Sequence, residues 1–232
     1  MATFLLVPGA GGTAWYWHRL VPALEQLGHR AIAVDLPAAD DGAGLEAYAD
    51  AIVAVGSGQG RVVVVGQSLG GFSAPLTCGR LDVAQLVFVN AMLPRPGETA
   101  GQWWENTGQA AARVEQARRE GRTLAAELDL REEFFHDVPD AFVEEAFVGG
   151  GGAQSDRPFA DVWPLPAWPD LPIHVLSGRA DRFFPLFFQQ RVARERLGLE
   201  PEVLPGGHCL ALSQPQELAA RLDACLVARG PA

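Results

Sequence analysis

The fold of this chain is indicated most clearly by the stretch Arg61-Val62-Val63-Val64-Val65-Gly66-Gln67-Ser68-Leu69-Gly70-Gly71. Its β-branched first half is typical of a buried parallel strand, and the residues from Gly71 onward can begin a helix. Between the two stands the pattern G-x-S-x-G, whose glycines permit the tight turn that such a strand–turn–helix unit requires. The context therefore predicts a nucleophile elbow with Ser68 at its tip.

Two later segments carry the residue types that complete a catalytic serine site. Residues 171–181 predict a strand followed by a loop that presents Asp181, and residues 201–208 predict a short last strand whose loop presents His208. A serine hydroxyl needs a base to take its proton, and a histidine oriented by an aspartate can do this. The chain order serine, aspartate, histidine is that of the α/β-hydrolase triad. We therefore expect Ser68, Asp181 and His208 to be the catalytic residues.

With these motifs the chain resembles the α/β-hydrolase superfamily, and more narrowly the esterase branch of the small serine esterases related to plant methylesterases and hydroxynitrile lyases. The resemblance extends from Phe4 to about Ala228 and is vague between residues 94 and 169. It implies an α/β-hydrolase fold. Its specific parts are four segments, residues 8–17, 66–71, 178–181 and 206–208.

The order of strands and helices along the chain indicates one α/β domain with an insertion. Strand–helix alternation stops near Met92 and resumes at Leu171, and it predicts about six parallel strands with helices on both faces. We predict a hydrolase core and a helical cap inserted after the fourth strand, with a glycine run as a flexible joint. These parts are residues 1–93 and 170–232 for the core, 94–169 for the cap and 149–152 for the joint. Helices are expected at residues 15–27, 45–55, 110–128, 132–148, 186–197 and 214–228.

The tetrahedral intermediate of acyl transfer needs two backbone N–H donors, each worth about 3 kcal/mol of barrier. Leu69 follows the serine and would supply one. By the resemblance, the second donor is Ala10, in the loop after the first strand. The family usually has His-Gly in that loop, whereas this chain has Pro8-Gly9. Because the donor is a backbone group, we expect the oxyanion hole to form without the histidine.

Several related chemistries are excluded by the same resemblance. The hydroxynitrile lyases of the family require a lysine directly after the catalytic histidine, where this chain has Cys209, and a threonine where it has Gly9. Epoxide hydrolases and dehalogenases need an aspartate in place of Ser68. Asn90 occupies the strand end where a minority of these folds place the acid, but an asparagine cannot fill that role. The other acids considered are read as structural or cap residues, namely Asp35, Asp161 and Asp170.

The substrate pocket is the least defined part of the prediction. Gly9 is expected in it, and cap side chains often line such a pocket, which favours apolar groups that enclose an acyl or aromatic moiety. The cap candidates are Trp103, Trp104, Phe134 and His136. By contrast, three other histidines are interpreted as structural, namely His18, His29 and His174.

Composition narrows the function further. The chain has 232 residues, 48% of them hydrophobic, and a formal net charge of −10, which argues against nucleic acid or an anionic membrane as a partner. All 18 basic residues are arginines, so Schiff-base chemistry and a P-loop lysine are excluded. Without a signal-like segment we expect a cytoplasmic protein. The surplus of Ala, Arg and Gly suggests a GC-rich bacterial genome.

The cysteines give no sign of a metal site. There are three, without metal-ligand spacing, and their plain interpretation is as small buried hydrophobic residues, although Cys209 directly follows His208. We therefore expect no metal and no cofactor. The oligomeric state cannot be inferred from the sequence.

Together these features predict a serine hydrolase that cleaves a small, largely apolar carboxylic ester through an acyl-enzyme intermediate. Two alternatives stay open. One is a ligand-binding or signal-receptor member of the fold with a slow or idle triad. The other is a non-hydrolytic cyclase or lyase of secondary metabolism that uses His208 as a general base.

Overall fold

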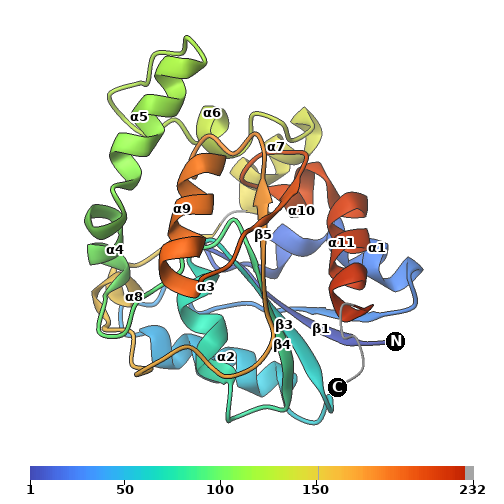
Figure 1. Cartoon of the computed structure of the whole chain (residues 1–232). Helices are drawn as coiled ribbons and strands as arrows, with labels where there is room; N and C mark the ends of the chain where they lie inside the picture. The colour runs from blue at the N-terminus through green and yellow to red at the C-terminus, as the bar shows by residue number, and fades with distance from the viewer. Residues whose placement is uncertain (151, 228–232) are drawn as a thin grey trace.

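The computed structural model describes residues 1–150 and 152–227. Its centre is a six-stranded parallel sheet in the order β2-β1-β3-β4-β5-β6 (Figure 1). The predicted sheet is therefore confirmed. The strands are β1 (Thr3–Val7), β2 (Arg30–Ala33), β3 (Val62–Gln67), β4 (Val83–Val89), β5 (Ile173–Gly178) and β6 (Glu202–Leu204).

Helices cover both faces of the sheet because the strands are apolar on both sides. In β1, Leu5 and Val7 point to one core and Phe4 and Leu6 to the other, as the period of two along a strand requires. The first core is closed by α2 (Leu45–Gly56), α3 (Gly70–Ser73) and α9 (Leu186–Leu197). The second is closed by α1 (Leu20–Gln26) and α11 (Pro215–Val227), which lie side by side in Figure 1.

Two helices of the core begin or end differently from the sequence prediction because of prolines. The expected helix 15–27 is divided into a 3₁₀ turn, η1 (Ala14–Trp17), and α1, whose third residue is Pro22. Proline fits the first turn of a helix but cannot donate a hydrogen bond in its interior. The helix after Ser68 is likewise short, and the chain continues as the 3₁₀ turn η2 (Ala74–Thr77) with Pro75 near its start. The remaining short helix of the core is α10 (Leu210–Ser213).

The segment between β4 and β5 is helical, where the sequence predicts a cap. The expected helix 110–128 ends at Arg119, shortly before Gly121, whose positive φ glycine adopts without strain, and the expected helix 132–148 is interrupted between Phe134 and Asp140, at Pro139. The helices α5 and α6 stand away from the sheet in Figure 1. The elements are α4 (Ala100–Thr107), α5 (Gln109–Arg119), α6 (Leu130–Phe134), α7 (Asp140–Glu145), the π-helical turn η3 (Ala146–Gly150) and α8 (Arg157–Ala160). The boundaries 94–169 stay a prediction, and the predicted joint includes Gly151, which lies outside the described residues.

The start of this segment is fixed to the core by a buried ion pair. Glu98 accepts hydrogen bonds from both terminal nitrogens of Arg196 in α9, at 2.9 Å for Nη2, and the two side chains are 4% and 1% exposed. Arg196 also donates to the carbonyl of Leu93, at 2.6 Å. Burial acts to raise the pKa of Glu98, but the hydrogen bonds from Arg196 and Asn106 outweigh it, and the pKa is lowered. In the described part of the chain, no helix is long and apolar enough to cross a membrane.

Candidate active site

Ser68 occupies the strained turn that the sequence predicts between β3 and α3. Its φ is +49°, a left-handed conformation that a non-glycine residue adopts only when its surroundings impose it. The flanking glycines are required by space: a Cβ on Gly66 would lie 2.8 Å from the carbonyl oxygen of Gly70, and one on Gly70 would lie 2.8 Å from that of Pro8. The turn therefore holds the serine at the C-terminal end of the sheet, with its side chain at the edge of a cavity.

Asp181 and His208 are brought together, as predicted, by the loops after β5 and β6. Nδ1 of His208 lies 2.8 Å from Oδ2 of Asp181, and both side chains are buried. A carboxylate can only accept, so Nδ1 carries the hydrogen and Nε2 is the free acceptor. Nε2 makes no hydrogen bond to any residue that the structure describes, and its imidazole lines the same cavity as Ser68.

The carboxylate of Asp181 is held in one orientation by further hydrogen bonds. Its Oδ1 accepts from the backbone N–H groups of Phe183 and Phe184, at 2.9 and 2.7 Å. Its Oδ2 accepts from the side-chain amide of Gln189 at 3.3 Å, and Ser177 donates to that amide's oxygen at 2.8 Å. This network keeps the buried carboxylate aimed at the imidazole.

Aromatic rings from the cap and from the loop after β5 enclose His208. Phe134 from α6, Phe183 and Phe184 each meet the imidazole edge-on, with centroids 4.9, 5.5 and 5.0 Å away. Such packing fixes the plane of the ring and keeps water from most of it. Phe134, predicted as a pocket residue, also lines the cavity.

Asn90 has a role at this site that the sequence analysis did not assign. It directly follows β4, has a φ of +44° and is completely buried. Its Oδ1 accepts the backbone N–H of Gly178 at 2.7 Å, and its Nδ2 donates to the carbonyls of Gly207 and His208 at 2.9 and 3.0 Å. One side chain thus ties the strand that leads to Asp181 to the loop that carries His208. The sequence does signal this role in part, because Asn90 directly follows a predicted strand, at the same edge of the sheet as the loops of Asp181 and His208.

The loop after β1 lies against the serine, as the sequence predicts. A Cβ on Gly9 would lie 2.8 Å from that of Ser68, so only glycine permits the approach. Among the described residues no acceptor is paired with the N–H of Ala10 or of Leu69. The next N–H, that of Gly11, donates instead to Oε1 of Gln154, at 3.0 Å. Gln154 also lines the cavity, and sequence analysis missed it because it lies 143 residues away.

The cavity at Ser68 has a volume of about 360 Å³, within the range of small-molecule sites. Its wall is largely apolar, and among the described residues that line it none is an Asp, Glu or Arg. The lining comprises Pro8, Gly9, Ala10, Gly11, Thr13, Trp15, Tyr16, Gln67, Ser68, Leu130, Phe134, Phe135, Ala146, Gly152, Gln154, His208, Cys209 and Leu212.

Three of the predicted pocket residues do not line this cavity. Trp103 is buried in the core, with its ring against Phe184 and Phe188, and its indole N–H donates to a backbone carbonyl. Trp104 packs on the same aromatic group. Their expected pocket role is corrected because α4 presents both indoles to the core rather than to the serine. His136 also lies outside the lining and packs beside Gly207; burial and the charge of Arg182 lower its pKa.

The cap contacts both loops that carry the acid–base pair. Oδ2 of Asp137 accepts the backbone N–H of Gly207 at 2.6 Å, one residue before His208. On the other side, Arg182, the neighbour of Asp181, donates to the carbonyl and carboxylate of Glu132 at 3.1 and 2.8 Å. These contacts place the stretch from Glu132 to Asp137 directly over the loops. Nothing in the local sequence signals them, because the partners are 50 and 70 residues apart.

Cys209 lies in the cavity wall as a neutral thiol. Burial raises its pKa well above the ordinary value, and the charges of Asp137 and Asp181 add to the effect. It packs with Leu212 and Val138 in a small apolar cluster. The hydroxyl of Tyr16 is nearby, buried and without a hydrogen-bond partner among the described residues, and burial raises its pKa in the same way. Neither group therefore offers a nucleophile at neutral pH.

The chain belongs to the alpha/beta hydrolase family, whose sequence profile matches residues 4–221. It is 41% identical over 111 residues to the probable esterase PIR7A of Oryza sativa subsp. indica, a match that covers 42% of each chain. It is 32% identical over 124 residues to Methylesterase 3 of Arabidopsis thaliana, over 48% of this chain and 47% of that protein. The matched parts thus span less than half the length of these relatives. Both are plant proteins, so they do not support the bacterial source inferred from composition.

A solved structure with the same fold is that of methylesterase MES16 from Arabidopsis. It superimposes with a TM-score of 0.75 over 98% of this chain and 99% of its own, at 20% identity. At that identity the likeness establishes the fold, and it agrees with the family membership.

Proposed function

We propose that this chain is a serine hydrolase that cleaves small, largely apolar carboxylic esters through an acyl-enzyme intermediate. The observation that carries the proposal is that Ser68, on its strained turn, and the Asp181-paired His208 line one apolar cavity. A free Nε2 on that imidazole is what a general base for the serine needs. The esterase names of the two sequence relatives favour the same activity.

In the first half-reaction, Oγ of Ser68 bonds to the ester carbonyl carbon as its proton passes to Nε2 of His208. The carbonyl electron pair moves onto oxygen, and the N–H groups of Ala10 and Leu69 would hold that oxyanion. When the intermediate collapses, the bond to the alkoxy oxygen breaks and the alcohol leaves with the proton from His208. Each oxyanion donor is worth about 3 kcal/mol of barrier.

In the second half-reaction a water molecule replaces the alcohol. His208 takes a proton from the water as its oxygen bonds to the acyl carbon, and then returns the proton to Oγ of Ser68 as the carboxylic acid departs. Asp181 keeps Nδ1 protonated and stabilises the imidazolium that exists between the two proton transfers. Its network with Gln189 and the two backbone N–H groups keeps this charge in place.

The cavity favours a neutral substrate. Its lining offers apolar side chains from the cap and, among the described residues, no Asp, Glu or Arg to balance a charge. A volume of about 360 Å³ suits a small acyl group and a small alcohol. We expect esters with a charged group close to the carbonyl to be poor substrates.

A fluorophosphonate probe with intact-mass readout tests the proposal. Wild type should gain one adduct, and Ser68→Ala and His208→Ala should gain none. Ser73→Ala is the matched control, because Ser73 is buried like Ser68 but lies on α3, outside the cavity lining; it should label like wild type. Labelling that persists in Ser68→Ala, or is lost equally in Ser73→Ala, would contradict the assignment. A panel of neutral and charged esters then tests the substrate class.

A further inference from the structure

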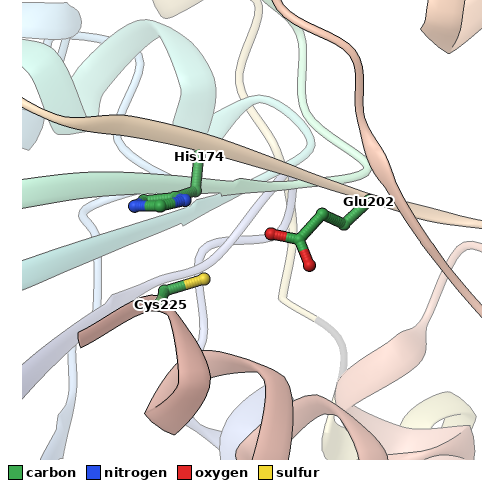
Figure 2. A group of neighbouring side chains, drawn as sticks. All are labelled: His174, Glu202 and Cys225. Carbon is green, nitrogen blue, oxygen red and sulfur yellow. The ribbon is translucent and has the colours of Figure 1, made fainter. Parts of the chain in front are cut away.

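A second group of reactive side chains lies away from the cavity, where β5, β6 and α11 meet. Figure 2 shows His174 from β5, Glu202 from β6 and Cys225 from α11 pointing into one space. An imidazole nitrogen, a carboxylate oxygen and the thiol sulfur all lie within 4.8 Å of one another. By the register of the sheet, His174 lies level with Val65 and Glu202 level with Gln67, so the group is separated from Ser68 across the sheet, by two and three strands from β3.

These donor atoms are not used by the protein in another way that would exclude a ligand. The imidazole of His174 makes no hydrogen bond to any described residue, and Cys225 is a free thiol. Glu202 pairs with Arg221 through Oε2 at 2.9 Å, which leaves Oε1 available. Access from solvent is open, because Glu202 is exposed and His174 is half-buried.

We propose that His174, Glu202 and Cys225 form a binding site for a zinc-class divalent cation, with water as the fourth ligand. Nitrogen, thiolate and carboxylate oxygen are the ligand types that Zn²⁺ takes in proteins, in a tetrahedral arrangement. Zinc–ligand bonds of about 2.0–2.3 Å put tetrahedral ligands roughly 3.3–3.8 Å apart. The three donor atoms lie within 4.8 Å of one another, so each pair has to close by at most roughly 1.0–1.5 Å to reach that spacing.

The thiol determines how the cation binds. The ordinary pKa of a cysteine thiol is about 8.5, so the protonated form predominates at neutral pH. A bound cation requires the thiolate, and binding therefore releases one proton per cation. The ion pair of Arg221 with Glu202 holds that carboxylate at the site from outside.

The consequence would be structural. The cation would join the terminal helix α11 to the two strands at one edge of the sheet, and ligands that bind only the folded protein stabilise it. Sequence spacing did not indicate this site, because the three ligands come from segments 28 and 23 residues apart and only the parallel strands and packed helix bring them together.

The test is titration of the metal-free full-length chain with ZnCl₂ by calorimetry in two buffers of different ionisation enthalpy. We expect one cation per chain and about one proton released. At a hundredfold excess over Kd, the Tm should rise by about 5–10 °C. Titration with Co²⁺ should give the absorption of a thiolate–cobalt bond.

The variants separate this site from any other. Cys225→Ala should abolish the thiolate band, and Glu202→Gln, an exposed isosteric change with little risk to folding, should weaken binding at least about tenfold. Cys78→Ala and Cys209→Ala are matched cysteine controls and should bind like wild type. The proposal would be overturned if wild type did not bind one cation per chain, or if Glu202→Gln and Cys225→Ala bound zinc as tightly as wild type.

Discussion

Replacing Asn90 by alanine should loosen the acid–base pair, because the Asn90 side chain ties together the segments that carry Asp181 and His208. The amide makes hydrogen bonds to the backbone of Gly178, Gly207 and His208, at 2.7 to 3.0 Å, and is completely buried. The variant removes all of them at once and leaves three buried backbone groups to find new partners.

The magnitude follows from these contacts. Three buried hydrogen bonds contribute about 1 kcal/mol each, and more when their partners stay unsatisfied. Alanine at a φ of +44° adds about 1 kcal/mol of backbone strain that asparagine tolerates better. We expect the free energy of unfolding to fall by about 3–5 kcal/mol. Asn90→Gly should be no less stable than Asn90→Ala, since glycine relieves the strain although it usually destabilises a folded position.

Urea unfolding measures the stability, and the rate of fluorophosphonate labelling measures the site. With an m-value of about 2–3 kcal/mol/M, the midpoint should drop by about 1–2.5 M. Because the loop of His208 loses its anchor, labelling should slow by about tenfold to a hundredfold. Gln85→Leu is the control on the same strand: the amide nitrogen of Gln85 is buried without a partner among the described residues, so its removal should be neutral or stabilising.

A loss below about 1 kcal/mol in Asn90→Ala, with an unchanged labelling rate, would refute this account. It would mean that the loops hold their positions through their own backbone contacts. A large loss of stability with a normal labelling rate would show that the amide supports the fold but not the site.

Other perturbations give equally definite expectations. Glu98→Gln should lower the free energy of unfolding by about 3–5 kcal/mol at pH 7, since it leaves the buried Arg196 unpaired. Because the folded-state pKa of Glu98 is lowered, this difference is full above the unfolded pKa of about 4.3 and should shrink as the pH falls below it. Urea unfolding of both proteins at pH 7 and pH 3.5 tests this. Asp137→Ala should lower kcat on a neutral ester about tenfold or more with little change in KM. Asp137→Asn can still accept the N–H of Gly207 and should retain most of the wild-type kcat. Equal losses in the two variants would show that the charge of Asp137 matters, and not the position of the loop that it holds. Burial raises the pKa of the Cys78, Cys209 and Cys225 thiols. Iodoacetamide at pH 7.5 should therefore leave the native protein unmodified and add three groups after denaturation. Fast labelling of the native protein would contradict this for whichever thiol reacts.

The sequence predicts the sheet and the positions of Ser68, Asp181 and His208 because both depend on local patterns. A β-branched run before G-x-S-x-G places the serine, and strand ends place the two partners on the same edge of a parallel sheet. The limits of helices are less predictable, since Pro22 and Pro75 divide segments whose periodicity continues past them.

The pocket could not be predicted in the same way. Trp103 is a large aromatic residue of the kind that often lines a pocket. Its ring instead packs in the core against Phe184 and Phe188, which come more than 80 residues later in the chain. Gln154 and Asp137 carry no local signal, because their partners are backbone N–H groups in distant loops. Such contacts are set by the packing of the cap, for which the sequence gives helices but no orientation.

The meeting of Gly11 and Gly152 has a consequence for protein engineering. A Cβ on Gly152 would lie 2.2 Å from the carbonyl oxygen of Gly11, so the cap segment at residue 152 meets the loop after β1 backbone to backbone. Gly152 itself lines the cavity, so a single methyl group at this residue would force the two backbones apart and change the shape of the cavity wall there. We therefore expect substitutions at residue 152 to change the size of substrate that the cavity admits, by altering the separation of two backbone segments. A library at this one position is a good place to begin.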